Sequence, residues 1–464
     1  MIATKPPRRR NNFDSVTWCL GGVLLLTAIV FLRSLENGFV FDDLDQIVHN
    51  RYLGEWSFIW KSMVNNALWF RDPNRPPALS YYRPFQNVWF ALNFHLFGLN
   101  AAGWHTAQAA LHLIVVWLVF RVAARLTDNR RVGLLAAALF AVMPLRAEPV
   151  VCIFAIGTPM SAAFELAAFD YYLRRFPSPA SFAGAGSHRR DRTAGGIRAK
   201  FAYPSTGRAD EGAGNSAALA ISLSLFGLAL LSHDCAIVFP ALVAAHAFLL
   251  EPHRPPGSYR TYALRARAAI AAAWPYLIEA AAYLCLRLWV LGFLSEPNPS
   301  NPPMTAIQRV LTIPAALWAY LKLLAMPWRA GPAHPLAAVS SVASQHFYLP
   351  AAGIVTLCAA AFFLLRNNAH RGLYLFCAAW FLITLAPILD LDVLFFQAAI
   401  QDRYLYLPSI GVCVFAADLV LSGFPLHLWR GVRGGVATAA VLVLAAMLFH
   451  AEAYWHDQAA MFTQ

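Results

Sequence analysis

The sequence predicts an all-α polytopic membrane protein, and three observations support this fold class. Hydrophobic residues make up 59% of the 464 residues, whereas charged residues make up only 13%. The mean hydropathy is +0.51. The apolar residues gather in runs of about 20, the length that an α-helix needs to cross a bilayer. Because a soluble domain would carry far more charge, we exclude that class.

The basic residues lie in short segments between the apolar runs. The net charge of +12 could by itself indicate a nucleic-acid ligand, but this placement is typical of the cytoplasmic loops of membrane proteins. No basic amphipathic helix with interleaved aromatic residues stands out, so we predict no nucleic-acid partner. The seven cysteines lie in or beside apolar runs without a CxxC pair, which indicates neither a disulfide framework nor a zinc site.

We predict about eleven transmembrane helices from the apolar runs and the alternation of basic segments. Residues 1–15 include Arg8, Arg9 and Arg10 and form a cytoplasmic tail, and the first run lacks an A-x-A-like cleavage site. The N-terminus is therefore inside and the C-terminus outside. The predicted helices cover residues 16–35, 103–126, 132–146, 149–172, 216–232, 235–250, 268–291, 348–366, 372–389, 404–424 and 435–452.

Three connecting segments stand out within what we predict to be a single transmembrane domain, residues 1–464. The first outer loop, 36–100, contains two aromatic amphipathic stretches, 55–60 and 85–92, which we expect to be helices in the membrane interface. Residues 174–215 are rich in Gly, Ser, Pro and Arg and predict a flexible cytoplasmic loop. A second outer loop, 292–347, contains the charged and proline-bearing run 306–326, which predicts a re-entrant or interfacial helix.

Two adjacent aspartates, Asp42 and Asp43, follow directly on the first apolar run. Neighbouring carboxylates repel each other, so they raise one another's pKa or attract a cation. Either state suits acid–base chemistry or metal binding. The alternative is that acidic residues at a helix end are simply solvated, and the pair alone does not decide between these interpretations.

The predicted topology gathers further polar residues on the outer face. An ionisable side chain near membrane depth costs about 2.5–3.5 kcal/mol on insertion scales, so several at one interface indicate a site. A transporter would instead place them near the midplane. Each residue also has a simpler interpretation: a helix cap, an ion pair of Glu148 with Arg146, or an aromatic belt. The candidates are Tyr82, Arg83, His105, Glu148, His233, Asp234, Arg403, Tyr404 and Tyr406.

Short motifs that contain these residues occur in order along nearly the whole chain. They are Phe39–Asp43, Tyr82–Pro84, Gly103–His105, Phe140–Pro144 before Glu148, Leu231–Asp234, Leu286-Arg287 and Asp402–Gly411. In this order they resemble the GT-C class of integral-membrane glycosyltransferases. The resemblance is to the membrane part of the O-mannosyltransferases that carry tetratricopeptide repeats, and to their bacterial relatives.

Three departures from the family pattern concern the chemistry. Where the family usually has Lys-Glu between the fifth and sixth helices, this chain has His233-Asp234, whose charge depends on pH. The family's Gly-Arg-x-Asp in the fourth helix is replaced by the uncharged Gly157–Met160, and we expect no repeat domain. These departures leave the substrate, and activity itself, open.

The resemblance implies a GT-C fold with a large first outer loop. It also implies an enzyme that moves a sugar, such as mannose, with inversion. The donor would be a polyprenyl-phosphate carrier, and the acceptor a hydroxyl of a protein, lipid or glycan on the outer face. By this resemblance Asp42 is the base, while Asp43 orients the acceptor, tunes Asp42 or binds a metal. Arg83 and Arg403 hold the donor phosphate.

The resemblance also implies how the rest of the site is built. An apolar groove beside 306–326 would hold the prenyl tail. No cofactor is certain, but a divalent metal ion is an open candidate, with Asp42, Asp43 and Glu148 as its candidate ligands. The residues that line the site are Tyr82, His105, Glu148, His233, Asp234, Tyr404 and Tyr406.

Two other functions stay open. A transporter or flippase for a lipid-linked sugar would show internal inverted repeats, and none is visible. A catalytically inactive relative that serves as a membrane assembly partner is compatible with the lost charges in the fourth helix. Since the sequence shows neither an organellar signal nor a repeat domain, we expect a bacterial inner (plasma) membrane, with the site on the periplasmic face.

Overall fold

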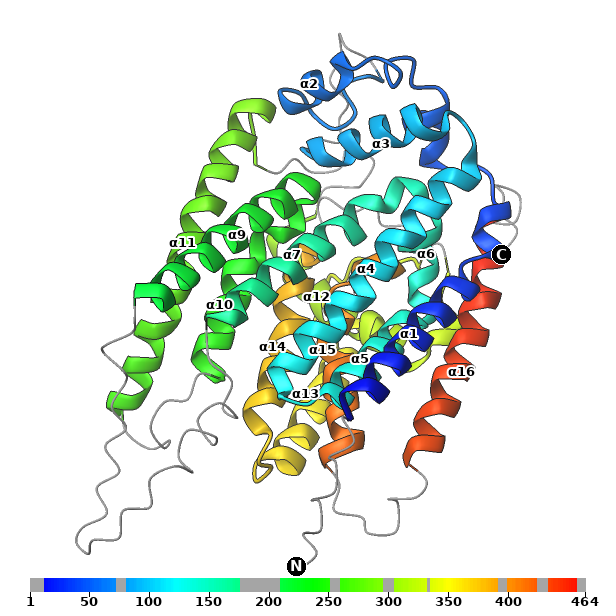
Figure 1. Ribbon diagram of the computed structural model, residues 1–464. Coiled ribbons are helices and arrows are strands. Elements are labelled where there is room, and N and C mark those ends of the chain that lie inside the picture. Colours follow the sequence, from blue (N-terminus) through cyan, green and yellow to red (C-terminus); the bar gives the residue numbers. More distant parts are fainter. Residues whose placement is uncertain are drawn as a thin grey trace, which may run out of the picture.

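The protein is an integral membrane protein built almost entirely of helices (Figure 1). Among the residues that the structure describes, eight helices are long and apolar enough to cross a membrane, or nine if the bent pair Arg130–Ala141 and Pro144–Val151 forms one span. The part of the chain that the structure describes contains no β-strand, and its one extended pairing is an antiparallel bridge between His334 and Ile400. The computed structural model describes residues 12–71, 81–175, 209–250, 259–294, 304–331, 334–390, 399–423 and 433–456.

The long helices form the bundle, and shorter ones connect them. The longer elements are α1 (Asn12–Val30), α3 (Pro84–Phe97), α4 (Ala101–Thr127), α5 (Arg130–Ala141), α7 (Gly157–Arg174), α9 (Ala209–Ser232), α10 (Phe239–Leu249), α11 (Tyr259–Leu291), α12 (Ala306–Ala325), α13 (Gln345–Leu365), α14 (Arg371–Leu385), α15 (Pro408–Asp418) and α16 (Arg433–Ala451). The short elements are η1 (Arg33–Glu36), η2 (Leu44–Val48), α2 (Ser57–Met63), η3 (Pro144–Arg146), α6 (Ala147–Val151), η4 (Ile153–Ile156), η5 (Asp234–Val238), η6 (Pro327–Arg329), η7 (Ala386–Leu389), η9 (Asp402–Leu405), η10 (Leu419–Gly423) and η12 (Glu452–Trp455).

The predicted number of eleven spans is not confirmed. Two of the predicted spans, 235–250 and 404–424, correspond to the shorter apolar helices Asp234–Leu249 and Pro408–Ser422. The run 306–326 forms α12, which is not among the candidate spans found in the described residues.

The structure corrects several predicted boundaries. Residues 144–151, where one predicted span ends and the next begins, form η3 and α6, which are bent by 67° from α5. The fourth span does not start at residue 149, because Cys152 interrupts the helix with extended backbone (φ −78°, ψ 117°). Proline removes a backbone donor and favours such breaks, and Pro144 and Pro149 flank this region.

The basic segments are more helical than predicted where the structure describes them. Helix α11 begins at Tyr259 and not at residue 268, since arginines are good helix formers whose heads reach the membrane surface. Residues 209–215 belong to α9 and not to a loop. The rest of the predicted flexible loop, 176–208, and most of the predicted tail, 1–11, lie outside the described residues.

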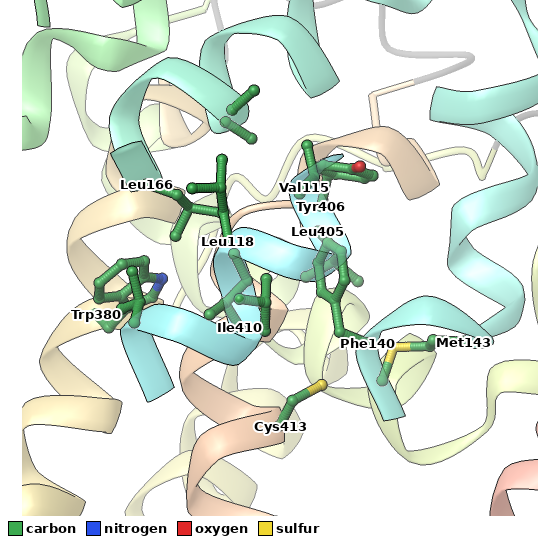
Figure 2. Packing of buried hydrophobic residues seen from close by; sticks show 14 of the residues in the cluster. Val115, Leu118, Phe140, Met143, Leu166, Trp380, Leu405, Tyr406, Ile410 and Cys413 are labelled. Carbon is green, nitrogen blue, oxygen red and sulfur yellow. The ribbon is translucent and has the colours of Figure 1, made fainter. Parts of the chain in front are cut away.

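The core of the bundle lies between α4, α5, α7, α14 and α15. Leu118, Phe140, Leu166, Trp380 and Ile410 come from these five helices and pack in one buried cluster. Figure 2 shows these side chains at close range. Because the helices are held by this common contact, the short segments at their ends have defined positions, and these segments carry the polar motifs.

The first outer loop forms a cap of its own over one end of the bundle, where α2 and α3 lie across the long helices (Figure 1). A second hydrophobic cluster stabilises it, with Ile47, Phe58, Trp69 and Phe90 packed against Trp104 of α4. The helices predicted in 55–60 and 85–92 are therefore present. The cluster also holds the segment that follows Asp42 and Asp43 against the bundle.

Candidate active site

The two adjacent aspartates have different environments. Asp43 is fully buried, and its carboxylate accepts hydrogen bonds from the backbone N–H groups of Val40 at 3.1 Å and Phe154 at 2.7 Å. Burial raises its pKa to about 7, against the lowering effect of these N–H donors. Asp43 thus joins the first outer loop to η4, and its neighbour Asp42 is the carboxylate with access to solvent.

Asp42 faces two guanidinium groups. Its side chain is 39% exposed, and its Oδ1 lies 3.7 Å from the nearest guanidinium nitrogen of Arg71. Burial raises the pKa of Asp42, while the positive charges of Arg71 and Arg403 act in the opposite direction. The preceding residue, Phe41, has a φ of 51°, an uncommon conformation for a bulky side chain.

Arg403 forms a buried ion pair with Glu148 across the bundle. Its Nη1 lies 3.2 Å from the carboxylate, and its backbone N–H donates to the other carboxylate oxygen at 2.9 Å. The guanidinium also lies 5.1 Å from the ring centre of Phe154 and 5.4 Å from that of Tyr404. The simpler interpretation of Glu148 as the partner of Arg146 is therefore wrong: Glu148 orients Arg403.

Asp234 is held by three groups from the first outer loop and α11. Arg83 lies 3.3 Å from one carboxylate oxygen, and Tyr283 donates its hydroxyl to the other at 2.7 Å. Arg287 forms an ion pair with the same oxygen as Tyr283. This cluster ties the end of α9 to the segment before α3, so Arg83 is positioned by Asp234 as Arg403 is by Glu148.

Tyr81 connects the two ion-pair clusters. The guanidinium of Arg83 lies 4.3 Å from its ring centre. Burial raises the pKa of Tyr81, and Tyr404, Arg83 and Arg403 all act electrostatically on its hydroxyl. The structure therefore brings together five of the predicted residues at one end of the bundle: Asp42, Arg83, Glu148, Asp234 and Arg403.

Other predicted site residues have structural contacts of their own. Tyr82 is buried and donates its hydroxyl to the carbonyl of Met63 at 2.8 Å. His233 accepts a hydrogen bond from the backbone of Cys235 at 3.2 Å and caps η5. His105 is 1% exposed and lies in α4 beside the backbone of Asn37 and Gly38.

Tyr406 lies in the core and not in the site cluster. Its hydroxyl is 2.6 Å from Nδ1 of His112, and its ring packs edge to face on Phe140 (Figure 2). The buried guanidinium of Arg146 lies 5.0 Å from the Tyr406 ring centre and bonds to the Ser409 hydroxyl. This buried network stabilises the segment 402–409, which also carries Arg403.

The sequence reasoning missed His334, which lies next to the site. Its Nε2 is 3.2 Å from Asp402, whose other oxygen accepts the backbone N–H of Gly331 at 2.9 Å. The bridge to Ile400 holds the same segment. The one available signal was a histidine between prolines in Pro332–Pro335, since proline favours a rigid loop.

The three candidate metal ligands do not form a metal site. Within the described residues, no group of three or more His, Cys, Asp or Glu side chains could hold a metal ion. The oxygens of Asp43 accept backbone N–H groups, and those of Glu148 face Arg403. We therefore derive no step through a metal.

Comparison with known proteins gives relatives for part of the chain, although no family model matches it. Over 163 residues it is 31% identical to protein O-mannosyl-transferase TMTC3 of Mus musculus, a stretch that covers 35% of this chain and 17% of that protein. Over 155 residues it is 30% identical to protein O-mannosyl-transferase Tmtc1 of Drosophila melanogaster, covering 33% of this chain and 18% of that one. The resemblance to membrane O-mannosyltransferases is confirmed. The matched stretch is less than a fifth of the length of either relative.

Two solved structures of GT-C glycosyltransferases are similar to nearly the whole chain. ArnT of Cupriavidus metallidurans, bound to undecaprenyl phosphate, is 16% identical with a TM-score of 0.44, covering 92% of this chain and 65% of that one. The oligosaccharyltransferase of Archaeoglobus fulgidus, tethered to an acceptor peptide, is 14% identical with a TM-score of 0.48, covering 94% and 55%. At these scores we transfer no residue role from either structure.

Proposed function

We propose that this chain is a GT-C-class membrane glycosyltransferase. It transfers a sugar from a polyprenyl-phosphate carrier to an acceptor hydroxyl on the outer face of the membrane. The observation that carries the proposal is the position of Asp42, a partly exposed carboxylate that Arg71 and Arg403 both influence. The similarity to protein O-mannosyl-transferases supports the class and favours mannose as the sugar and a protein hydroxyl as the acceptor.

Asp42 acts as the general base in this proposal. It takes the proton of the acceptor hydroxyl while the hydroxyl oxygen attacks the anomeric carbon. As the new bond forms, the bond from that carbon to the phosphate oxygen breaks on the opposite face, so the configuration is inverted and the carrier phosphate leaves with its negative charge. Burial raises the pKa of Asp42, which makes it a stronger base, and the two guanidiniums favour its ionised form.

Arg403 and Arg83 stabilise the negative charge of the leaving phosphate. A guanidinium has five N–H donors, so the ion pairs with Glu148 and Asp234 orient these arginines without using all of their donors. Prepositioned cations lower the barrier most where charge develops in the transition state. Tyr404 and Tyr81 lie beside these guanidiniums and line the donor site.

An apolar groove near the site is a candidate for the prenyl chain. It has a volume of about 420 Å³ and lies between η6, which directly follows α12, and α16. Trp328, Val443 and Met447 are among its lining residues. The groove lies beside the segment that follows α12, and we propose it as the groove that the sequence analysis expects next to 306–326.

The orientation of the chain in the membrane, and the identity of that membrane, are also part of the proposal. The polar cluster lies on the outer face and the N-terminus is inside, as the basic segments indicate. A bacterial inner membrane stays a prediction, because the curated relatives named above are animal proteins.

The test is transfer of labelled sugar from a panel of short-chain polyprenyl-phosphate donors by the purified protein. We expect Asp42→Asn to abolish transfer, a loss of at least about 100-fold, because general-base catalysis contributes ~10²–10⁴-fold. Asp45→Asn is the matched control, since Asp45 lies one turn further on and contacts the same Arg71 at 3.1 Å. It should retain most of the activity.

Three outcomes are decisive. Transfer that depends on the carrier and on Asp42 supports the proposal. Full activity of a folded Asp42→Asn protein removes the proposed base. Donor binding without transfer, for every donor in the panel, favours an inactive relative or a transporter of the lipid-linked sugar.

A further inference from the structure

A cluster of arginines surrounds one buried carboxylate in α7, away from the candidate site. Asp170 is 2% exposed. It contacts Arg121 at 2.8 Å, Arg125 at 2.7 Å and Arg174 at 2.9 Å. The first two come from the last turns of α4 and the third from the end of α7. We call these three residues the arginine cluster.

The arginine cluster lies at the other end of the bundle from the candidate site. Gly157, at the start of α7, lies against Ser232 and His233. Asp170 is about 20 Å further along the same helix, at ~1.5 Å per residue. Trp117 is 40% exposed one turn before Arg121, and the two stack at 4.7 Å. An exposed tryptophan beside a cation marks the bilayer interface.

The charges of the arginine cluster do not balance. A single carboxylate offsets one guanidinium, so three arginines around Asp170 leave an excess of two positive charges. Arg130, Arg131 and Arg175 lie at the adjoining helix ends, together with Asp128. The side chains of Arg125 and Arg174 are 39% and 34% exposed, so both can reach a ligand outside the bundle.

We propose that the arginine cluster binds the phosphate of an anionic phospholipid headgroup in the leaflet opposite the candidate site. The planar fork of arginine matches phosphate oxygens and can bind them bidentately. Asp170 holds the three guanidiniums together at the level where headgroups lie, beside an exposed aromatic ring that can contact the upper acyl chain. The interfacial position selects a lipid phosphate over a free phosphate from solution.

The proposal is tested by native mass spectrometry of the purified full chain in detergent, with dioleoylphosphatidylglycerol and dioleoylphosphatidylcholine as probes. The wild type should retain the phosphatidylglycerol in preference to the phosphatidylcholine. Replacing Arg125 and Arg174 by Gln should weaken phosphatidylglycerol binding roughly 30-fold, since each basic residue at a membrane surface contributes about fivefold. Arg366→Gln, an exposed arginine at the end of α13, is the matched control and should change little.

Equal retention of the two lipids by the wild type would overturn the proposal. This comparison uses the wild-type protein alone, so it does not depend on whether a variant folds. Unchanged phosphatidylglycerol binding in the folded double variant would overturn the proposal as well. Displacement of the lipid by millimolar inorganic phosphate would show a free-anion site instead. Sugar transfer is measured separately, so the failure of either proposal leaves the other standing.

Discussion

At the scale of single residues, two aspartates that are adjacent in the sequence have different environments and therefore different roles. Asp42 and Asp43 are neighbours, yet one is partly exposed beside Arg71 and the other is buried against Val40 and Phe154. A motif identifies the pair, but the fold of the loop decides which carboxylate faces a substrate. We therefore assign the base to Asp42 and a structural connection to Asp43.

The buried position of Asp43 predicts a pH-dependent stability. Its pKa rises from 3.8 to about 7 on folding, chiefly because of burial, so the folded state holds the proton more tightly than the unfolded state. The stabilising contribution of the neutral form is fully present below pH 3.8 and is lost as the pH rises to about 7. The melting temperatures of the wild type and of Asp43→Asn should be measured in detergent across this pH range. The melting temperature of the wild type, relative to that of Asp43→Asn, should fall as the pH increases. A constant difference would contradict the assigned burial.

At the scale of elements, breaks in helices position the site. Glu148 lies in α6, just before the break at Cys152, and Phe154 follows in η4. Arg403 lies in η9, which precedes α15. A continuous helix would point these side chains along one axis, whereas short turns at the ends of packed helices let several elements converge. The close packing of α14 and α15 keeps η9 in place.

Helices α14 and α15 are in close contact at Gly411. A Cβ at this position would lie 2.6 Å from the carbonyl oxygen of Cys377 and 3.1 Å from the Cβ of Trp380. We expect Gly411→Ala to destabilise the protein by about 1–3 kcal/mol, the range for an overpacked core. Gly434→Ala, with no heavy atom within 4 Å of its Cβ, should be neutral or slightly stabilising. Melting temperatures in detergent measure both, and equal shifts would contradict the close contact.

At the scale of the whole molecule, the two ends of the bundle differ in charge pattern. The end capped by α2 and α3 combines carboxylates with arginines in paired contacts. The end that carries the arginine cluster has an excess of positive charge around Asp170. By the positive-inside rule we expect this second end to be cytoplasmic, which fits the proposal that the candidate site faces outward.

This orientation is tested by labelling with a membrane-impermeant maleimide in intact cells, in a variant whose native cysteines are replaced. Trp60 of α2 is 75% exposed, so Trp60→Cys should be labelled from outside. Arg366→Cys, at the end of α13 that lies away from α2 (Figure 1), should be labelled after permeabilisation alone. The reverse pattern would place the site in the cytoplasm.

The sequence by itself determined the membrane class, most helix positions and the family resemblance. These depend on length, apolar runs and the order of short motifs, which are properties of the chain read in one dimension. Five of the residues that gather at the site, Asp42, Arg83, Glu148, Asp234 and Arg403, were named from the sequence on this basis.

Only the tertiary structure decided how these residues pair. Arg403 with Glu148, Arg83 with Asp234, and Asp43 with Phe154 are contacts between segments far apart in the chain. Such pairs have no signal in local pattern, because packing of the long helices sets the distance between their ends. The same packing placed Tyr406 in the core beside His112 and brought His334 to Asp402.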